Sequence, residues 1–302
     1  MTLPTLARHV SLVATITVLC AALTGCIDAS SARYHDTRRV EVAHVPGSAV
    51  EVQARNGSIE ISRSSGGGAG GDEVVVSAVI RARTQDRLDN TTIVIHRETS
   101  DGALRISADW PDGRVLSGES CSFVVHLPDA NGVRAETTNG AIRLAGLAGE
   151  AVLTTSNGRV AVDGHDGAVS VRTSNGRVGL NDVAGATSVR TSNGRVETVN
   201  VGAPLTISTS NGRVQASLRP DAPGPIDIAS SNGAVSVVVG KAFAGRLALS
   251  TSNGRVSYTD GEGTDFSGRG SLNVQVGQGE TPSRVRSSNG SIAVRVGAEQ
   301  AE

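Results

Sequence analysis

The chain has 302 residues and a formal net charge of −1, which argues against a protein that binds polyanions through its overall charge. Aromatic residues make up only 2%, whereas there are 37 glycines. A conventional globule of this length builds its core on larger side chains. The composition therefore favours a narrow core of Val, Ile, Leu, Ala and Thr, as in a stack of thin coils.

Residues 1–25 are predicted to be the signal peptide of a lipoprotein. An apolar run over residues 10–23 follows Arg8, and it is too short to be a spanning helix with flanks. The segment ends in Leu-Thr-Gly-Cys, which resembles the bacterial lipobox; the alternative is an ordinary signal peptide cut elsewhere. By this resemblance Cys26 carries the acyl chains that hold the protein at the membrane. Because Ile27 follows, Gram-negative sorting implies the periplasmic face of the outer membrane or the cell surface.

The next segments are predicted to be a tether and an irregular β region. Residues 26–39 are polar and aperiodic, as expected of a tether, and residues 40–130 contain alternating or β-branched runs separated by turn residues. Within them Thr84–Asn90 is expected to form one helical turn. Cys121 is the only cysteine after the leader, so we expect no intrachain disulfide and a thiol that points into the core.

Residues 131–297 repeat one unit, Thr-Ser-Asn-Gly-Arg-Val in its full form, and residues 298–302 form a tail. The steps between successive Asn residues are 18, 18, 18, 18, 21, 21 and 36, and residues 269–272 fit inside the last step as a degenerate copy. A fixed period of this size is typical of stacked repeats. The predicted turn residues are Asn139, Gly140, Asn157, Gly158, Asn175, Gly176, Asn193, Gly194, Asn211, Gly212, Asn232, Gly233, Asn253, Gly254, Asn289 and Gly290.

Positions counted from the Asn of each unit predict two short strands per coil. Position −2 is Thr or Ser, position +3 is apolar, and Asn-Gly is expected to supply the positive φ of a tight corner. The predicted fold is all-β, a parallel β-helix or solenoid of about 18-residue coils. The repeat half is expected to form a rod about 40 Å long. Asn-Gly is also a hairpin signal, so the rival architecture is an antiparallel meander or barrel. The same outward residue recurs at the same position in nearly every unit. Stacked coils produce such rows of identical side chains, whereas a barrel gives no reason for them, so we favour the solenoid.

The lipobox, the irregular β start, the Val-Val-His-Leu-Pro step at residues 124–128 and the x-Asn-Gly-x-Val-x-Val units resemble the bacterial "putative adhesin" family of β-strand-repeat proteins. The resemblance covers roughly residues 40–297. It implies a single-stranded right-handed β-helix, and the family has no established activity. The Arg that follows Asn-Gly departs from the acidic or neutral residue expected there.

Catalytic and metal-binding patterns are not evident in the sequence. Parallel β-helices that cleave glycans need paired carboxylates on one face, whereas the acidic residues here do not recur in one column. The closest approach to a cluster, residues 163–166 with sequence Asp-Gly-His-Asp, is better explained as a turn than as a cation site. We therefore expect no enzyme, no cofactor and no bound metal.

Arginines at positions +2 and −3 are the candidate binding residues. The ordinary interpretation is a solvated face that keeps the surface soluble. The functional interpretation is a basic ridge that binds acidic envelope polymers, or another surface protein, without nucleic acid. The hypothesis is a lipid-anchored, adhesin-like binding or scaffold module; the alternatives are a glycan-processing β-helix enzyme and a structural element that stacks on itself. The candidate residues are Arg159, Arg172, Arg177, Arg190, Arg195, Arg213 and Arg255.

Overall fold

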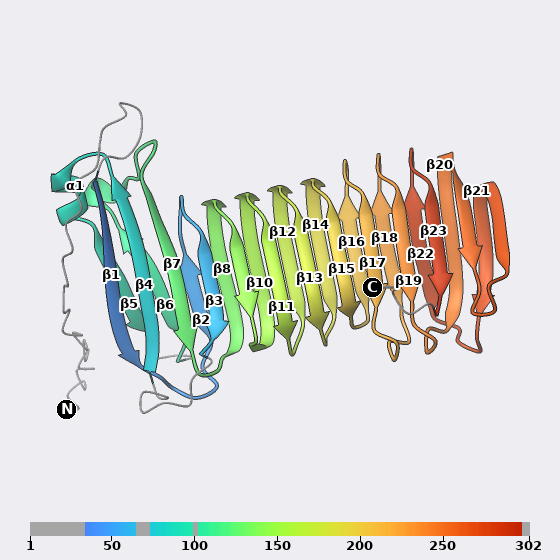
Figure 1. Cartoon of the computed structure of the whole chain (residues 1–302), viewed down its shortest axis with the longest axis horizontal. Coiled ribbons are helices and arrows are strands. Elements are labelled where there is room, and N and C mark those ends of the chain that lie inside the picture. Colours follow the sequence, from blue (N-terminus) through green and yellow to red (C-terminus); the bar gives the residue numbers. More distant parts are fainter. Residues whose placement is uncertain (1–33, 65–72, 99–101, 298–302) are drawn as a thin grey trace, which may run out of the picture.

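The computed structural model describes residues 34–64, 73–98 and 102–297. Short strands lie side by side along one axis and build a long, narrow stack (Figure 1). The signal peptide, Cys26 and the tail at 298–302 lie outside the described residues. Within those residues, no helix is long and apolar enough to cross a membrane.

One series of paired strands, here called face A, contributes the strand that precedes Asn-Gly in each coil. Its members pair in parallel through most of the stack. In spatial order they are β5 (Thr92–Arg97), β6 (Leu104–Asp109), β2 (Val50–Gln53), β8 (Asn131–Asn139), β10 (Ala148–Asn157), β12 (Val169–Asn175), β14 (Thr187–Asn193), β16 (Leu205–Thr209), β18 (Ile226–Ser230), β22 (Pro282–Ser287) and the first part of β20 (Gly245–Thr259).

A second series, face B, contributes the strand that follows Asn-Gly, and it too is parallel through the middle of the stack. Parallel pairing excludes the antiparallel meander and confirms the predicted solenoid. In spatial order the strands are β1 (Tyr34–Ala43), β4 (Glu73–Ala82), β7 (Ser120–Leu127), β3 (Ile59–Arg63), β9 (Ile142–Ala145), β11 (Val160–His165), β13 (Val178–Val183), β15 (Val196–Val201), β17 (Val214–Leu218), β19 (Val235–Val239), β23 (Ile292–Val296) and the second part of β20.

The inward side chains of both faces form one continuous core. Position +3 is buried in every coil, as predicted, and Val160, Val178 and Val196 are each 0% exposed. Cys121 is buried as expected, and burial raises the pKa of its thiol to about 12. Small and β-branched residues suffice because only two layers of side chains meet between the faces.

The N-terminal end of the stack is closed by antiparallel strands and a short helix. β4 pairs antiparallel with β1 and β7, and β5 with β6. The expected helical turn is confirmed as α1 (Gln85–Asp89), where the Thr84 hydroxyl accepts from Arg87 N at 3.3 Å; η1 (Pro111–Gly113) follows β6. The Arg87 guanidinium forms an ion pair with buried Glu119, with a separation of 2.7 Å between Nε and Oε1.

The tether predicted for residues 26–39 is too long, because β1 already begins at Tyr34. None of its side chains is fully buried, and the residues before Val40 lack the apolar alternation that identifies a strand in a sequence. Tertiary contacts hold it instead: it pairs with β4, and the Arg38 guanidinium donates to the carbonyl oxygens of Leu88, at 2.8 Å, and Thr91.

The C-terminal end differs from the prediction in two ways. Residues 269–272 are not a degenerate coil; they belong to β21 (Asp265–Val276), which runs antiparallel to β20 and covers the last coil. In addition, the coil formed by β22 and β23 lies between β18/β19 and β20, although it comes last in the sequence. The long final step between Asn residues therefore contains the antiparallel strand β21 and not a further coil.

Candidate functional site

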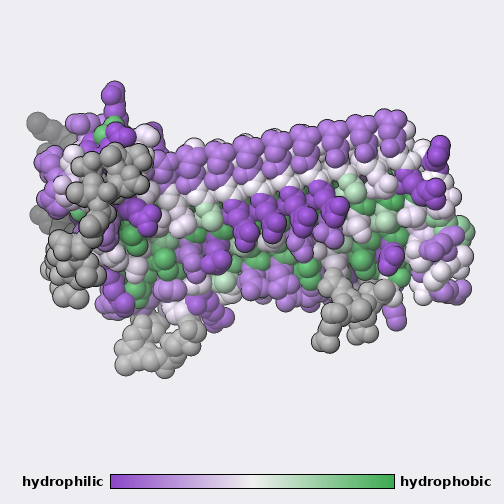
Figure 2. Space-filling view, turned by 45° about the horizontal axis from the view of Figure 1, so that its top comes forward, coloured by the Kyte–Doolittle hydropathy of each residue, from purple (hydrophilic) through white to green (hydrophobic). Residues whose placement is uncertain are grey.

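The Asn residues of the repeat form an unbroken row of side-chain hydrogen bonds along one edge of the stack. In each pair the Nδ2 group of one coil donates to the Oδ1 atom of its neighbour, for example Asn157 to Asn139 at 2.8 Å and Asn175 to Asn157 at 2.9 Å. The row begins at Asn56, whose Nδ2 group donates to the Glu119 carbonyl oxygen at 3.2 Å. The space-filling view shows hydrophilic rows of this kind running along the stack (Figure 2). In spatial order the row is Asn56, Asn139, Asn157, Asn175, Asn193, Asn211, Asn232, Asn289 and Asn253.

The glycines that follow these Asn residues serve close packing, not positive φ. None of the predicted corner residues from Asn139 to Gly290 has a positive φ, so that part of the prediction is wrong. A Cβ atom at Gly176 would lie 1.8 Å from the Gly158 carbonyl oxygen, and one at Gly158 would lie 1.9 Å from that of Gly140. Only glycine allows the backbones of stacked corners to approach so closely.

At most of the coils the inward Thr or Ser at position −2 bonds to one of these stacked glycines, whereas the hydroxyls of Thr173, Thr191 and Thr209 are buried without a hydrogen-bond partner among the described residues. The Thr155 hydroxyl donates to the Gly140 carbonyl oxygen at 3.1 Å, and the Thr251 hydroxyl to that of Gly290 at 2.9 Å. The predicted Asn, Gly and Thr positions thus form one structural unit at the corner of each coil, here called the Asn-Gly edge. It stabilises the stack and leaves ligand chemistry to the outward side chains.

Four of the predicted arginines stand in consecutive coils at position +2, where face B begins. The backbone shows their register, since Val160 N donates to Arg177 O at 3.0 Å and Val178 N to Arg195 O at 2.9 Å. Neighbouring strands lie about 4.8 Å apart, so the guanidinium stems start one inter-strand spacing from each other. This set is named the Arg column, and it consists of Arg159, Arg177, Arg195 and Arg213.

The other predicted arginines lie apart from the Arg column. Arg172 and Arg190 are directly paired on face A, on the opposite side of the Asn-Gly edge. Arg255 is separated from Arg213 by the coils that carry Ala234 and Ser291 at the same position. The sequence shows the unit with Ala234 between them but not the coil with Ser291, because the order of the last coils in space differs from their order in the chain.

None of the seven predicted arginines forms an ion pair with an acidic side chain of the described residues. Other arginines on the same two faces do: Arg143 lies 3.5 Å from Glu60, and Arg286 lies 3.3 Å from Asp227. The Arg column is exposed and uncompensated, and each neighbouring pair of charges at about 4.8 Å repels by roughly 0.9 kcal/mol in water before screening by salt. A partner with negative charges would relieve this repulsion.

A groove that was not predicted lies beside the Arg column on the outer side of face B. It has a volume of about 420 Å³, and its floor is formed by position +4, where Ala161 and Gly179 are paired across β11 and β13. Arg143 and Glu197 occupy the same position in the flanking coils. The signal available in the sequence was the loss of large side chains at position +4 in two successive units.

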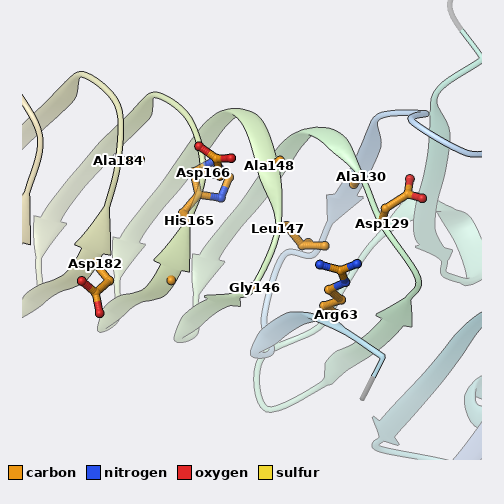
Figure 3. Close-up of a pocket in the computed structure, with 11 residues that line it drawn as sticks. Arg63, Asp129, Ala130, Gly146, Leu147, Ala148, His165, Asp166, Asp182 and Ala184 are labelled. Carbon is orange, nitrogen blue, oxygen red and sulfur yellow. The ribbon is translucent and has the colours of Figure 1, made fainter. Parts of the chain in front are cut away.

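A second cleft lies at the opposite edge of the coils, where each chain segment returns from face B to face A (Figure 3). Its volume is about 460 Å³, and Asp129, His165, Asp166 and Asp182 line it. The carboxyl groups of Asp166 and Asp182 do not point toward one another, and that of Asp129 accepts from Gly47 N at 2.6 Å. The cleft therefore lacks the facing carboxylate pair that a glycan-cleaving β-helix needs.

His165, which belongs to the turn considered as a cation site, is a core residue. It is 2% exposed, its Nε2 atom lies 2.9 Å from the Gly149 carbonyl oxygen, and desolvation lowers its pKa. Among the described residues, no three His, Cys, Asp or Glu side chains come together in a way that would hold a metal ion.

Comparison with solved structures finds several likenesses, and two of them are described here. One is to a solved structure described as a putative adhesin from Bacteroides fragilis NCTC 9343, with a TM-score of 0.47 and 11% identity over 86% of this chain and 97% of that chain. The other is to one described as a putative cell adhesion protein from Clostridium sporogenes ATCC 15579, with a TM-score of 0.26 and 12% identity over 87% of this chain and 100% of that chain. No family model and no curated protein matches the sequence.

Proposed function

We propose that the protein is an adhesin-like binding module of the cell envelope that holds acidic polymers along the Arg column. The observation that supports this proposal is the alignment of Arg159, Arg177, Arg195 and Arg213 in consecutive coils without acidic partners. A polymer with regularly spaced negative charges complements a row of cations that repeats along a rigid stack.

The fold contributes by holding the arginine stems in place before binding. Each stem begins at the Asn-Gly edge, where hydrogen bonds between Asn side chains and close contacts between glycines hold the backbone. A preorganised row loses less conformational entropy on binding than cations carried by flexible loops. The ordinary alternative, a solvated face, predicts the same structure without a ligand.

The test is a titration of lipid-free protein with an acidic polymer, polygalacturonate, at low and at physiological salt. The decisive variant changes all four residues of the Arg column to Gln, and a matched control removes the same charge elsewhere by changing Arg134, Arg246, Arg269 and Arg284 to Gln. These control residues are exposed and make no ion pair with the described residues. We expect binding that weakens with salt and is lost in the Arg column variant alone.

Equal weakening in both variants would mean that net charge, not the column, attracts the polymer. No binding by the unaltered protein at low salt would leave the Arg column as a solvated face. A third variant, with Arg172 and Arg190 changed to Gln, asks whether the pair on face A contributes. Because its residues lie on the other side of the Asn-Gly edge, we expect a smaller loss than in the Arg column variant.

We also propose that a lipid on Cys26 anchors the module to the membrane, on the basis of the Leu-Thr-Gly-Cys ending of the leader. Cys26 comes shortly before Tyr34, where β1 begins, so the stack would sit near the membrane surface. Changing Cys26 to Ser is expected to release the protein from the membrane fraction or to leave it unprocessed. Membrane fractionation and intact mass decide this, and a processed mutant that stays with the membrane would contradict the anchor.

A further inference from the structure

The groove on face B contains a glycine that the fold itself does not require. Gly179 lies inside β13, has no positive φ, and a Cβ atom built on it would meet nothing within 4 Å. Gly176, three residues earlier, is the opposite case, since its Cβ would lie 1.8 Å from a carbonyl oxygen. Glycine in a strand interior costs stability and often marks a place where a ligand approaches the backbone. Gly179 keeps the floor of the groove open.

The two long sides of the groove differ in chemistry. The Arg column runs just outside one side, because exposed Arg177 directly precedes β13 and comes two residues before Gly179, while Arg143 is the arginine that lines the groove itself. On the other side Asp163 and Asn181 face outward in neighbouring coils, and Asn181 Nδ2 donates to Asp163 Oδ1 at 2.8 Å. That bond leaves the second N–H and the carbonyl oxygen of Asn181, and one carboxylate oxygen of Asp163, for a ligand.

We propose that this groove binds a ring of an acidic polysaccharide, with its carboxylate toward the Arg column and its hydroxyls toward Asp163 and Asn181. The inference rests on the proposed function and names the class of polymer. A ring lying flat against Ala161 and Gly179 would have the exposed Arg159 and Arg177, two residues before these positions, on one side, and the hydrogen-bonding groups of Asp163 and Asn181 on the other. The outer surface of the stack shows exposed apolar surface beside the hydrophilic rows (Figure 2).

The acidic residues of the groove discriminate against polymers that are charged on every side. Asp163 and Glu197 both line it, and their carboxylates repel a chain such as polyphosphate that carries charge all around its backbone. A polymer with one carboxylate per ring can direct its charges to the arginines and its hydroxyls to these residues. The groove therefore selects sugars, whereas the Arg column alone would attract any polyanion.

The experiment compares polygalacturonate with polyphosphate at matched salt in the full-length protein and in a variant that fills the groove. Gly179→Val places a strand-favouring side chain on the groove floor, where there is free space. Ser188→Val, on the exposed side of face A, is the matched control for an added apolar surface residue. Circular dichroism and a thermal melt confirm that each variant is folded.

We expect Gly179→Val to weaken polygalacturonate binding by at least about tenfold, as steric blocking of a fitted site does, and to leave polyphosphate binding unchanged. Ser188→Val should change neither. Equal affinity of Gly179→Val and the unaltered protein for polygalacturonate would overturn the groove while the Arg column stands. Equal loss of both polymers would overturn sugar selection. If neither polymer binds the unaltered protein at low salt, the Arg column fails together with the groove.

Discussion

Asn289 donates a hydrogen bond of 2.7 Å to Asn232, although 57 residues separate them. Asn253, which lies between them in the sequence, bonds to the far side of Asn289 at 2.8 Å. The chain therefore passes over one coil position, builds the terminal coil and β21, and then returns to fill the gap with β22 and β23. The C-terminal end is held by insertion and not by simple addition of a last coil.

Two deletions of similar length are expected to have opposite effects. Removing residues 175–192 takes out one whole coil and lets Asn193 stack on Asn157, so a soluble, shorter solenoid with nearly the same melting temperature should remain. Removing residues 282–297 leaves an empty coil position between β18/β19 and β20. That variant should lose cooperative unfolding of its C-terminal end or aggregate. Circular dichroism melts and size-exclusion chromatography compare the two.

Gly176→Ala and Gly179→Ala form a matched pair in one coil. The first forces a methyl group against the Gly158 carbonyl oxygen and should destabilise the protein by about 1–3 kcal/mol or more. The second meets no atom within 4 Å, and it should stabilise by roughly 0.5–1 kcal/mol because the unfolded chain loses freedom. Denaturant unfolding measures both. Equal effects would show that glycine is not needed for stacking at the corner.

Asn175→Ala should cost about 1–3 kcal/mol, because it removes the bond donated to Asn157 and the one accepted from Asn193, each 2.9 Å. Asn273→Ala is the control, since Asn273 is exposed on β21 and outside the row. Chemical denaturation of both variants gives the comparison. If Asn175→Ala were as stable as the control, the side-chain row would be a consequence of stacking and not a cause.

Glu119→Gln should lower the free energy of unfolding by about 3 kcal/mol at pH 7, because Arg87 is left without its buried counter-charge. Burial pushes the pKa of Glu119 upward, but hydrogen bonds from Arg87 and from the backbone N–H groups of Leu116 and Arg83 outweigh it, so the pKa is lowered on balance.

A carboxyl group with a lowered pKa contributes stability above its unfolded value, about 4.3, and loses it as the pH falls through the folded value. The difference between wild type and Glu119→Gln should therefore be full at pH 7 and shrink below about pH 4. Exposed Glu150, changed to Gln, provides the control. A difference that stays constant down to pH 3 would contradict the ion pair.

The middle of the stack was predictable because each coil repeats the same residues at the same positions. The Asn positions, the inward Thr and the apolar residue at position +3 recur with a fixed period, and one rule placed them all. The first part of β1, before Val40, was missed because it has no apolar alternation, and β21 was missed because its antiparallel pairing depends on where β20 lies. Only the structure shows that a corner glycine is required by the close approach of the glycine in the next coil and not by a positive φ of its own.

The sequence predicted the Arg column of the candidate site but not the groove beside it. The repeat period aligned Arg159 with Arg177, Arg195 and Arg213, but it could not show that the inserted coil stands between Arg213 and Arg255, which nevertheless line one cleft. The groove exists because Ala161 and Gly179 have no large side chains. In a chain with many glycines, two small residues are a weak sequence signal for a groove.

The two ends of the stack are built differently from its middle, and this has a consequence for evolution. α1 and the antiparallel strands close one end, β21 closes the other, and each central coil presents the same Asn, Gly and Thr to both of its neighbours. Duplication of one 18-residue segment of a gene would therefore lengthen the protein by about 4.8 Å without a new interface having to be invented. Duplication of a unit such as residues 157–174 would also add one more arginine to the Arg column, so the length of the protein and its number of binding groups would increase together.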